Sequence, residues 1–340
     1  MGQREPIPLI RQAELRPTLD LLSEIGAPTG RLLARARLPA RVQQRGDGFA
    51  AARSLFRFMA VAADYAEMED LGWRSAMRAR VEELGAWGEP VSRCWRLRDA
   101  IQAFCTLYAR DVPFAELGLA LETEHAWLWR RRDLPQRDPR GEMLGEQFML
   151  GAMVQMVRMA AGCHWTPPAI RIESPCSDWA LRAAGLGKSQ PCFGGPVLAI
   201  AVPHHLLDRR LTRATSLDTE RAGEAANDRA ACNFAGSLQQ ALTLFTGEMP
   251  ISLELGAEIA NPSSRTLRRW LAQEGTSWRQ VVDRVRFRAC EELLLDPAIR
   301  LTEISAGLGY ADQAHFTRAF LRWTGETPGA WRRRRLDPDA

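Results

Sequence analysis

Three arginines share one side of a predicted helix in the segment SSRTLRRWLAQ, which begins at Ser263. Arg265, Arg268 and Arg269 recur at positions i, i+3 and i+4, whereas large apolar residues occupy the opposite side. No acidic residue stands between Arg265 and Gln273 to limit repulsion among the guanidinium groups. Guanidinium groups bind phosphates and guanine edges, so the pattern favours an anionic partner. A plain solvated surface helix is the alternative interpretation.

A second segment, DQAHFTRAFLRWTG, places polar side chains at the start of another predicted helix, with Asp312 as its N-cap. Gln313, Thr317 and Arg318 lie outside a stripe of large apolar residues, and His315 flanks them. Gln can bond adenine, Arg can bond guanine, and the Thr methyl group can pack on thymine. The segment therefore predicts contacts with base edges in the DNA major groove. For His315, a surface position or a phosphate contact is the alternative.

Both segments belong to an approximate internal repeat, Leu253–Gly275 and Leu301–Gly325, that contains a short helix, a turn and a second helix in each copy. A capping box, Ser277 to Gln280, begins the long amphipathic helix between the copies. We expect that helix to have about 19 residues and to span about 28 Å. Recognition helices in successive major grooves on one DNA face lie about 34–36 Å apart, which this spacer allows.

Positive charge is concentrated on the first predicted recognition segment. The whole chain has 340 residues and a net charge of only +4, which says little about its partners. Residues 263–288 contain seven arginines and two acids, whereas residues 232–340 contain 14 arginines and 13 acids. We therefore expect DNA binding that weakens strongly as the salt concentration rises.

The N-terminal part of the chain alternates between helical and strand patterns and predicts a mixed α/β domain. Apolar helical runs occupy residues 51–68 and 144–161, and short apolar stretches typical of buried strands occupy 114–121, 126–129 and 197–202. Residues 209–231 are small, charged and poor in large apolar side chains. The predicted organisation is a mixed α/β domain (1–208), a linker (209–231) and an all-α domain (232–335) with helix-turn-helix units at about 252–275 and 301–325.

Two further groups of residues allow a binding site but also have simpler interpretations. Trp127, Trp129, Trp165 and Trp179 would suit an aromatic ligand pocket, although regularly spaced aromatic residues are more often part of a core. The adjacent side chains in His204-His205 point apart, and no further residue has metal-ligand spacing. We assign no ligand-binding residues, and we expect no metal site and no cofactor.

The sequence does not predict an enzyme. Gly194-Gly195 does not continue into a phosphate-binding loop, and no Gly-x-Ser-x-Gly motif occurs. The seven cysteines include no Cys-x-x-Cys pair, which argues against a zinc site and a disulfide framework. Two alternatives stay open: a thiol redox sensor that binds DNA, and an enzyme fused to a DNA-binding tail. With neither a secretory signal nor an apolar span of membrane length, we expect a cytoplasmic protein without membrane contacts.

The segments RTLRRWLAQEGTSWRQVVDRVR and LTEISAGLGYADQAHFTRAFLRWTGETPGAWR closely resemble the DNA-binding domain of AraC/XylS-type transcription regulators, over about residues 233–333. The resemblance implies contacts with double-stranded DNA at the following positions: Arg265, Arg268 and Arg269 of the first unit, and Gln313, His315, Thr317 and Arg318 of the second.

The front half resembles the arabinose-binding type of N-terminal domain found in ornithine-utilisation-type regulators. The resemblance rests on LRPTLDLLSEIGAP, on GEQFMLGAMVQMVRMAAGCHWTPPAIRI and on the segment that ends VPHHLLDRRL. It implies a domain that senses a small-molecule effector and forms a homodimer, without implying that the effector is a sugar. The expected function is transcription activation, with RNA polymerase as a further partner.

Two positions depart from the pattern of that family in the first unit. Gly256 stands where the supporting helix usually carries an aliphatic residue, and Asn261-Pro262 lies in the turn. A glycine inside a helix costs about 0.5–1 kcal/mol relative to alanine. We therefore expect the first unit to be looser than the second.

Overall fold

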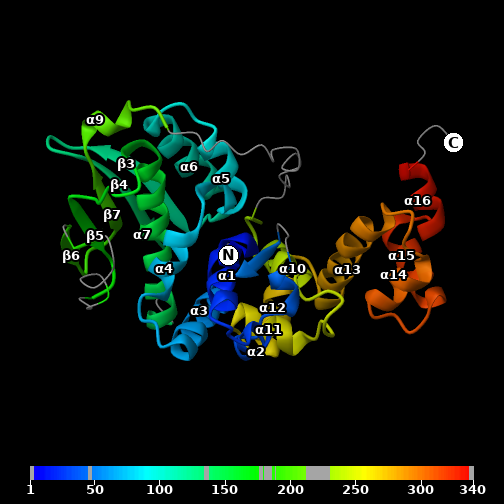
Figure 1. Cartoon of the computed structure of the whole chain (residues 1–340). Helices are drawn as coiled ribbons and strands as arrows, with labels where there is room; N and C mark the ends of the chain where they lie inside the picture. Colours follow the sequence, from blue (N-terminus) through cyan, green and yellow to red (C-terminus); the bar gives the residue numbers. More distant parts are fainter. Residues whose placement is uncertain are drawn as a thin grey trace. The chain divides into compact units, whose positions relative to one another are not determined.

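The computed structural model describes residues 4–44, 48–133, 138–175, 179, 186–187, 189–211 and 230–336. Its contacts divide the chain into two compact units. Figure 1 labels the helices and strands of both. The N-terminal unit comprises Pro8–Asp47 and Ala51–Ala230, and the C-terminal unit comprises Met1–Ile7, Gly48–Ala50 and Ala231–Ala340. Within the predicted linker 209–231, residues 212–229 lie outside the described residues.

Helices and strands alternate along the first 211 residues, which confirms the predicted mixed α/β class. The elements are β1 (Leu9–Arg11), η1 (Gln12–Leu15), α1 (Arg16–Glu24), α2 (Thr29–Arg35), η2 (Ala40–Gln43), β2 (Phe49–Ala51), α3 (Ala52–Ala66), α4 (Leu71–Arg78), η3 (Val81–Glu83), α5 (Gly85–Ser92), α6 (Leu97–Asp111), β3 (Ala115–Leu121), β4 (Ala126–Arg132), α7 (Pro139–Ala161), β5 (Ala169–Ile172), β6 (Gln190–Phe193), β7 (Leu198–Val202) and α9 (His204–Leu207).

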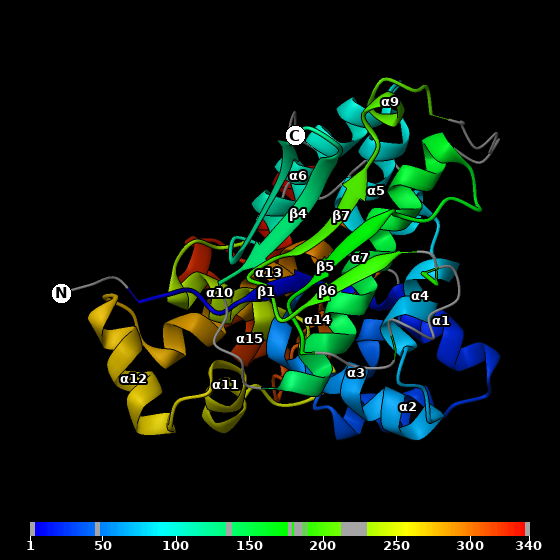
Figure 2. The same cartoon turned by 90° about the vertical axis from the view of Figure 1, so that its left-hand side faces the viewer.

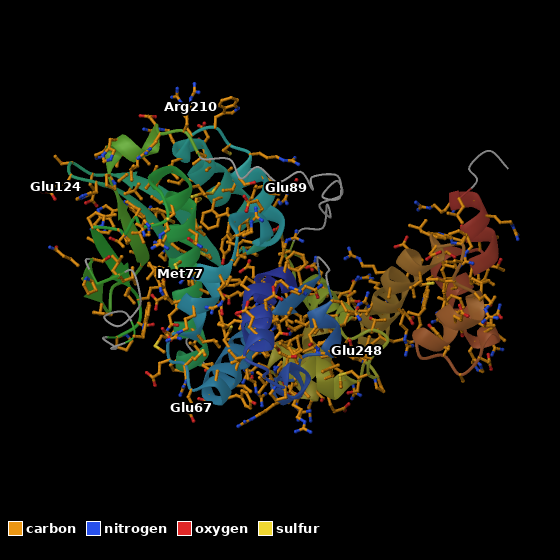
Figure 3. All side chains as sticks on the ribbon, viewed as in Figure 1. Glu67, Met77, Glu89, Glu124, Arg210 and Glu248 are labelled. Atoms are coloured by element: carbon orange, nitrogen blue, oxygen red, sulfur yellow. The ribbon has the colours of Figure 1, made fainter. Side chains whose placement is uncertain are left out.

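Five strands form one sheet in the order β3-β4-β7-β5-β6, and only β5 and β6 run parallel (Figure 2). The β3–β4 hairpin pairs Ala115 with Arg132 and Leu121 with Ala126, and Glu124 lies at its tip (Figure 3). The three strands that the sequence predicts are confirmed as β3, β4 and β7. β4 continues to Arg132, three residues beyond the predicted end.

Helix α7 joins the sheet to the remaining helices of the N-terminal unit. It packs against β7, while α3 and α4 pack on α7. Glycines permit these close approaches, since a Cβ atom on Gly145 would lie 2.6 Å from the Phe56 ring and one on Gly151 would lie 2.4 Å from Ala76 Cβ. The predicted helical runs are confirmed as α3 and α7. The second begins five residues early because Asp138 caps it, accepting a hydrogen bond from the Gly141 amide at 3.0 Å.

The C-terminal unit contains seven described helices. These are α10 (Phe234–Thr243), α11 (Leu253–Ala260), α12 (Ser264–Gln273), α13 (Trp278–Leu294), α14 (Leu301–Gly307), α15 (Gln313–Thr324) and α16 (Pro328–Leu336). The first residues of the chain pack in the same unit: the Ile7 amide donates to Ser237 Oγ at 2.8 Å, and the Arg4 guanidinium lies 3.8 Å from the centre of the Trp270 ring. None of the helices in the described part of the chain has the length and apolar character needed to cross a membrane.

Candidate nucleic-acid interface

The first helix-turn-helix unit consists of α11 and α12, and local hydrogen bonds fix the start of α12. Ser263 Oγ accepts a hydrogen bond from the Thr266 amide at 3.2 Å, which confirms the predicted N-cap. After the helix ends at Gln273, Gly275 adopts a left-handed φ of 72°, a conformation that favours glycine. Leu267 and Leu271 are fully buried, so the opposite side of α12 faces solvent.

Arg265, Arg268 and Arg269 are all exposed on that solvent side. Among the described residues, none of the three has a hydrogen-bond or ion-pair partner. The two nearby acids are engaged elsewhere. Glu274 accepts hydrogen bonds from the amides of residues 234 and 235 at 3.2 and 2.9 Å, at the start of α10. Asp283 forms an ion pair with Arg322 at 3.1 Å. The structure thus leaves three adjacent guanidinium groups available to an anionic partner.

The second unit consists of α14 and α15, and it presents a different set of side chains. Asp312 Oδ1 accepts a hydrogen bond from the His315 amide at 2.7 Å, which confirms this N-cap, and Gly325 ends the helix with a φ of 79°. Gln313 and Arg318 are exposed, and no partner for either lies in the described part of the chain. Thr317 is half-buried beside them.

His315 differs from the other candidates of α15 because its ring already has a partner. Its Nδ1 atom lies 2.8 Å from Asp312 Oδ2. Hydrogen bonds from the backbone and the ring of His315 lower the pKa of Asp312. The imidazole is therefore held against the helix cap, with one ring nitrogen left for an external group.

An aromatic core holds α15 in place. Phe316 and Phe320 are fully buried, their ring centres lie 5.8 Å apart, and Trp331 of α16 meets Phe320 edge to face at 6.1 Å. The chain forms a further helix after α15, α16, which begins at Pro328. Its Trp331 belongs to the same core.

Helix α13 connects the first helix-turn-helix unit to the second (Figure 1). The predicted capping box is confirmed, with the Ser277 amide donating to Gln280 Oε1 at 2.9 Å and the Gln280 amide donating to Ser277 Oγ at 3.3 Å. The helix has 17 residues, so it spans about 25 Å rather than the expected 28 Å. Val281 and Val285 are buried between the packed elements, as their spacing predicts.

The two departures from the family pattern have structural explanations in the first unit. A Cβ atom at Gly256 would lie 2.4 Å from Cζ3 of Trp278, so the glycine makes room for the indole ring. Asn261 ends α11 in the left-handed conformation, with a φ of 69°, which Asn tolerates better than most residues. The Trp278 ring therefore occupies the space that an aliphatic side chain at Gly256 would fill in other members of the family.

We expect Gly256→Ala to fail to stabilise the protein, although alanine favours a helix by about 1 kcal/mol. Overpacking against Trp278 should offset that gain, and Gly256→Leu should destabilise the first unit by about 1–3 kcal/mol. In the Trp278→Ala background, Gly256→Ala should become stabilising. Thermal unfolding and hydrogen exchange of α11 measure both effects. An equal gain from Gly256→Ala in the two backgrounds would contradict this explanation.

The four tryptophans considered for a ligand pocket do not converge. Trp127 and Trp129 lie on one face of β4, where Arg171 stacks 3.8 Å from the Trp127 ring centre and Trp129 covers Gly118. Trp179 is buried in the core, and Trp165 packs at its edge. All four therefore serve packing.

One histidine of the pair has a partner nearby, and three cysteines have raised pKa values. His204 Nε2 lies 2.8 Å from the Glu122 carbonyl oxygen, and no three potential metal ligands cluster among the described residues. Burial raises the pKa of Cys94, and it raises the pKa of Cys105 to about 11 and that of Cys290 to about 12. A raised pKa reduces the thiolate fraction, so these three thiols are poorly suited to redox sensing. Cys176 lies outside the described residues.

Comparison with known sequences places this geometry in a family. A family model described as "Arabinose-binding domain of AraC transcription regulator, N-term" matches residues 26–211, more than half of the chain. The chain belongs to the AraC family of transcription regulators. A second model, "Helix-turn-helix domain", matches residues 257–334 of this AraC-type regulator. The protein is thus a DNA-binding transcription regulator and not an enzyme.

Two relatives come from Pseudomonas aeruginosa. The HTH-type transcriptional regulator VqsM is 35% identical over 145 residues, which cover 41% of the present chain and 44% of VqsM. The ornithine utilization regulator is 28% identical over 346 aligned residues, covering 96% of the present chain and 98% of that protein. The crystal structure of the transcriptional regulator CdpR, also from Pseudomonas aeruginosa, aligns with a TM-score of 0.37 and 20% identity over 94% of the present chain and 98% of CdpR.

Proposed function

We propose that this AraC-type regulator reads two successive major grooves of DNA, one with α12 and the other with α15. The residues proposed to contact bases or phosphates are Arg265, Arg268, Arg269, Gln313, His315, Thr317 and Arg318. The single observation that carries this proposal is the contrast between α12 and its surroundings. The three arginines of α12 are exposed and unpaired among the described residues, while both nearby acids are bound to other groups.

Arg318→Ala should weaken binding to the operator by about 1–3 kcal/mol and relax base preference at one position, because a guanidinium that bonds a guanine edge is lost. Competition binding with operator variants, each changed at one base pair, measures both quantities.

Arg322→Ala is the matched control, since Arg322 lies one turn further along α15 and already pairs with Asp283. We expect this variant to lose less than about 0.5 kcal/mol of DNA affinity and to keep the same base preference. If Arg318→Ala behaved like this control, α15 would not read DNA through Arg318.

The N-terminal part, residues 1–208, is proposed to bind a small metabolite and to transmit its presence through the linker 209–231 to the DNA-binding domain 232–335. Support comes from the match of residues 26–211 to an effector-binding type of domain. A relative aligned over nearly the whole chain is named for ornithine utilization, which is consistent with a metabolic signal.

We further propose that the protein acts in the cytoplasm as a homodimeric activator that contacts RNA polymerase. Dimers bind paired half-sites with matched symmetry, which raises specificity for an operator. The N-terminal domain is the proposed dimerisation domain, as the family resemblance implies.

A further inference from the structure

A cavity lies inside the N-terminal unit, between η1, α1, α3, α6, α7 and the adjoining ends of β3 and β4. The centre of a water molecule can occupy about 50 Å³ inside it. Most of the wall is apolar, with Leu55, Phe56 and Met59 from α3 and Phe148 and Met149 from α7. Apolar walls that carry a few polar groups are typical of small-molecule sites.

Two arginines from β4 supply the positive groups of this cavity. Arg130 and Arg132 stand two residues apart, so their side chains leave the same face of the strand. Both pair with Glu173: Arg130 Nη2 lies 3.5 Å from Oε1, and Arg132 Nη2 lies 2.8 Å from Oε2. Arg130 is only 3% exposed.

Each of these guanidinium groups nevertheless keeps one buried donor without a partner. Within the described residues, no acceptor lies within hydrogen-bond distance of Arg130 Nε or Arg132 Nη1. Glu146, the other buried acid nearby, is occupied by the Glu173 amide at 2.5 Å and the Ser174 amide at 3.2 Å. A buried donor without an acceptor is unfavourable by about 1–3 kcal/mol, and by more when the group is charged. Both side chains line the same cavity, and within the described part of the chain neither donor has an acceptor, so a ligand that brings one would satisfy them.

The remaining acid of the cavity, Glu14, does not supply that acceptor. Burial raises the pKa of Glu14 to about 8, and Asp111 raises it further while Arg11 and Arg130 oppose the shift. Tyr108 also lines the cavity, beside Glu14 and the two arginines. A carboxyl group that is protonated at neutral pH donates a hydrogen bond and does not repel an anion.

We propose that this cavity binds a small organic acid whose carboxylate accepts hydrogen bonds from Arg130 Nε and Arg132 Nη1 and whose apolar body packs against α3 and α7. The proposal rests on the metabolite response proposed above and assigns its ligand class. A carboxylate offers two oxygens and about four acceptor positions, enough for two guanidinium donors. An amine brings donors only, which leaves both arginine donors unpaired.

Hexanoate, hexanamide and hexylamine have the same chain length and differ in the head group, so they separate the possible ligand classes. Calorimetric titration of the full-length protein at pH 7 should detect hexanoate binding, with hexanamide and hexylamine at least about tenfold weaker. Arg132→Gln should weaken hexanoate binding by about 10- to 100-fold. Arg132 is used because Arg130 is more deeply buried and its replacement risks misfolding.

Arg131→Gln is the matched control. Arg131 lies between the two arginines, points to the other face of β4 and pairs with Glu116 at the surface. This variant should bind hexanoate like the unmodified protein. Preferential hexylamine binding, absence of hexanoate binding at millimolar concentration, or equal losses in the two variants would overturn the proposal.

Operator affinity measured with and without hexanoate separates this proposal from the proposed function. Hexanoate binding that Arg132→Gln weakens, without any change in operator affinity, supports the site and contradicts the metabolite response. A change of operator affinity with hexylamine, in the absence of hexanoate binding, supports a metabolite response and overturns the assigned ligand class.

Discussion

Asp111→Ala is expected to destabilise the N-terminal unit by about 3–5 kcal/mol, because it leaves Arg11 charged and buried without its main partner. Arg11 Nε donates to Asp111 Oδ2 at 2.6 Å and Nη2 donates to Oδ1 at 3.1 Å, and the two side chains are only 1% and 2% exposed. The pair ties β1 to α6 next to the cavity that we assign to the ligand. Loss of the carboxylate should therefore lower the denaturant midpoint and increase hydrogen exchange in peptides from both elements.

Two controls distinguish a buried charge from a general loss of contacts. Glu116→Ala breaks a surface ion pair, in which the Arg131 side chain is 58% exposed and the Glu116 side chain is 63% exposed. This variant should change stability by less than about 1 kcal/mol. The double variant Arg11→Leu/Asp111→Leu removes both charges and should recover most of the stability lost in Asp111→Ala. A double variant as unstable as the single one would show that packing, rather than charge, dominates at this position.

The sequence was most informative where the cause of a structure is local. Ser263, Asp312 and the box Ser277 to Gln280 each cap a helix through a residue three positions away, so a short window contains both partners. The strands β3, β4 and β7 were predictable for a related reason, since each contains a short apolar run, although β4 continues past its run into three arginines. β5 and β6 were not predicted, and only their place in the sheet reveals them as strands, with β5 beside β7 and β6 beside β5.

The cavity was missed because its polar groups are distant in sequence. Glu14, Tyr108 and Arg130 come from three elements, and Arg11 meets Asp111 across 100 positions. Because the strand is predicted to end at Trp129, the three arginines that follow it, Arg130–Arg132, are interpreted as exposed to solvent. Continuing the alternation of Ala126 and Leu128 would have placed Arg130 on the buried face of β4, a usable signal in the residues themselves.

At Gly256 a local rule describes the isolated helix and leaves out a contact made by a residue distant in sequence. The intrinsic preference of glycine against a helix predicts a loose first unit. The structure instead packs Trp278, 22 positions later, against the bare backbone at Gly256. Helix propensity describes α11 as an isolated segment. The contact between Trp278 and Gly256 depends instead on the tertiary packing of α13 against α11, which helix propensity does not include.

The stability of the N-terminal unit should fall as the pH rises from 6 to 8 through the titration of Glu14. The folded-state pKa is about 8, against an ordinary value of 4.5, so between these values the folded protein holds a proton that the unfolded chain has released. Folding then binds one proton, and the free energy of unfolding decreases by about 1.4 kcal/mol per pH unit. The contribution of Glu14 is constant below about pH 4.5 and above about pH 8.

Glu14→Gln should remove this dependence, because the amide is neutral at every pH. Urea unfolding of both proteins at pH 6 and pH 8 gives the difference, and the variant should gain about 2–3 kcal/mol relative to the unmodified protein over that interval. Glu24→Gln is the control, since it makes the same change of side chain at a position that is 61% exposed and pairs with Arg78 at the surface. If the two variants gave parallel pH profiles, Glu14 would be ionised in the folded protein. The cavity would then carry a fixed negative charge beside Arg130, which would disfavour a carboxylate and favour a cationic ligand.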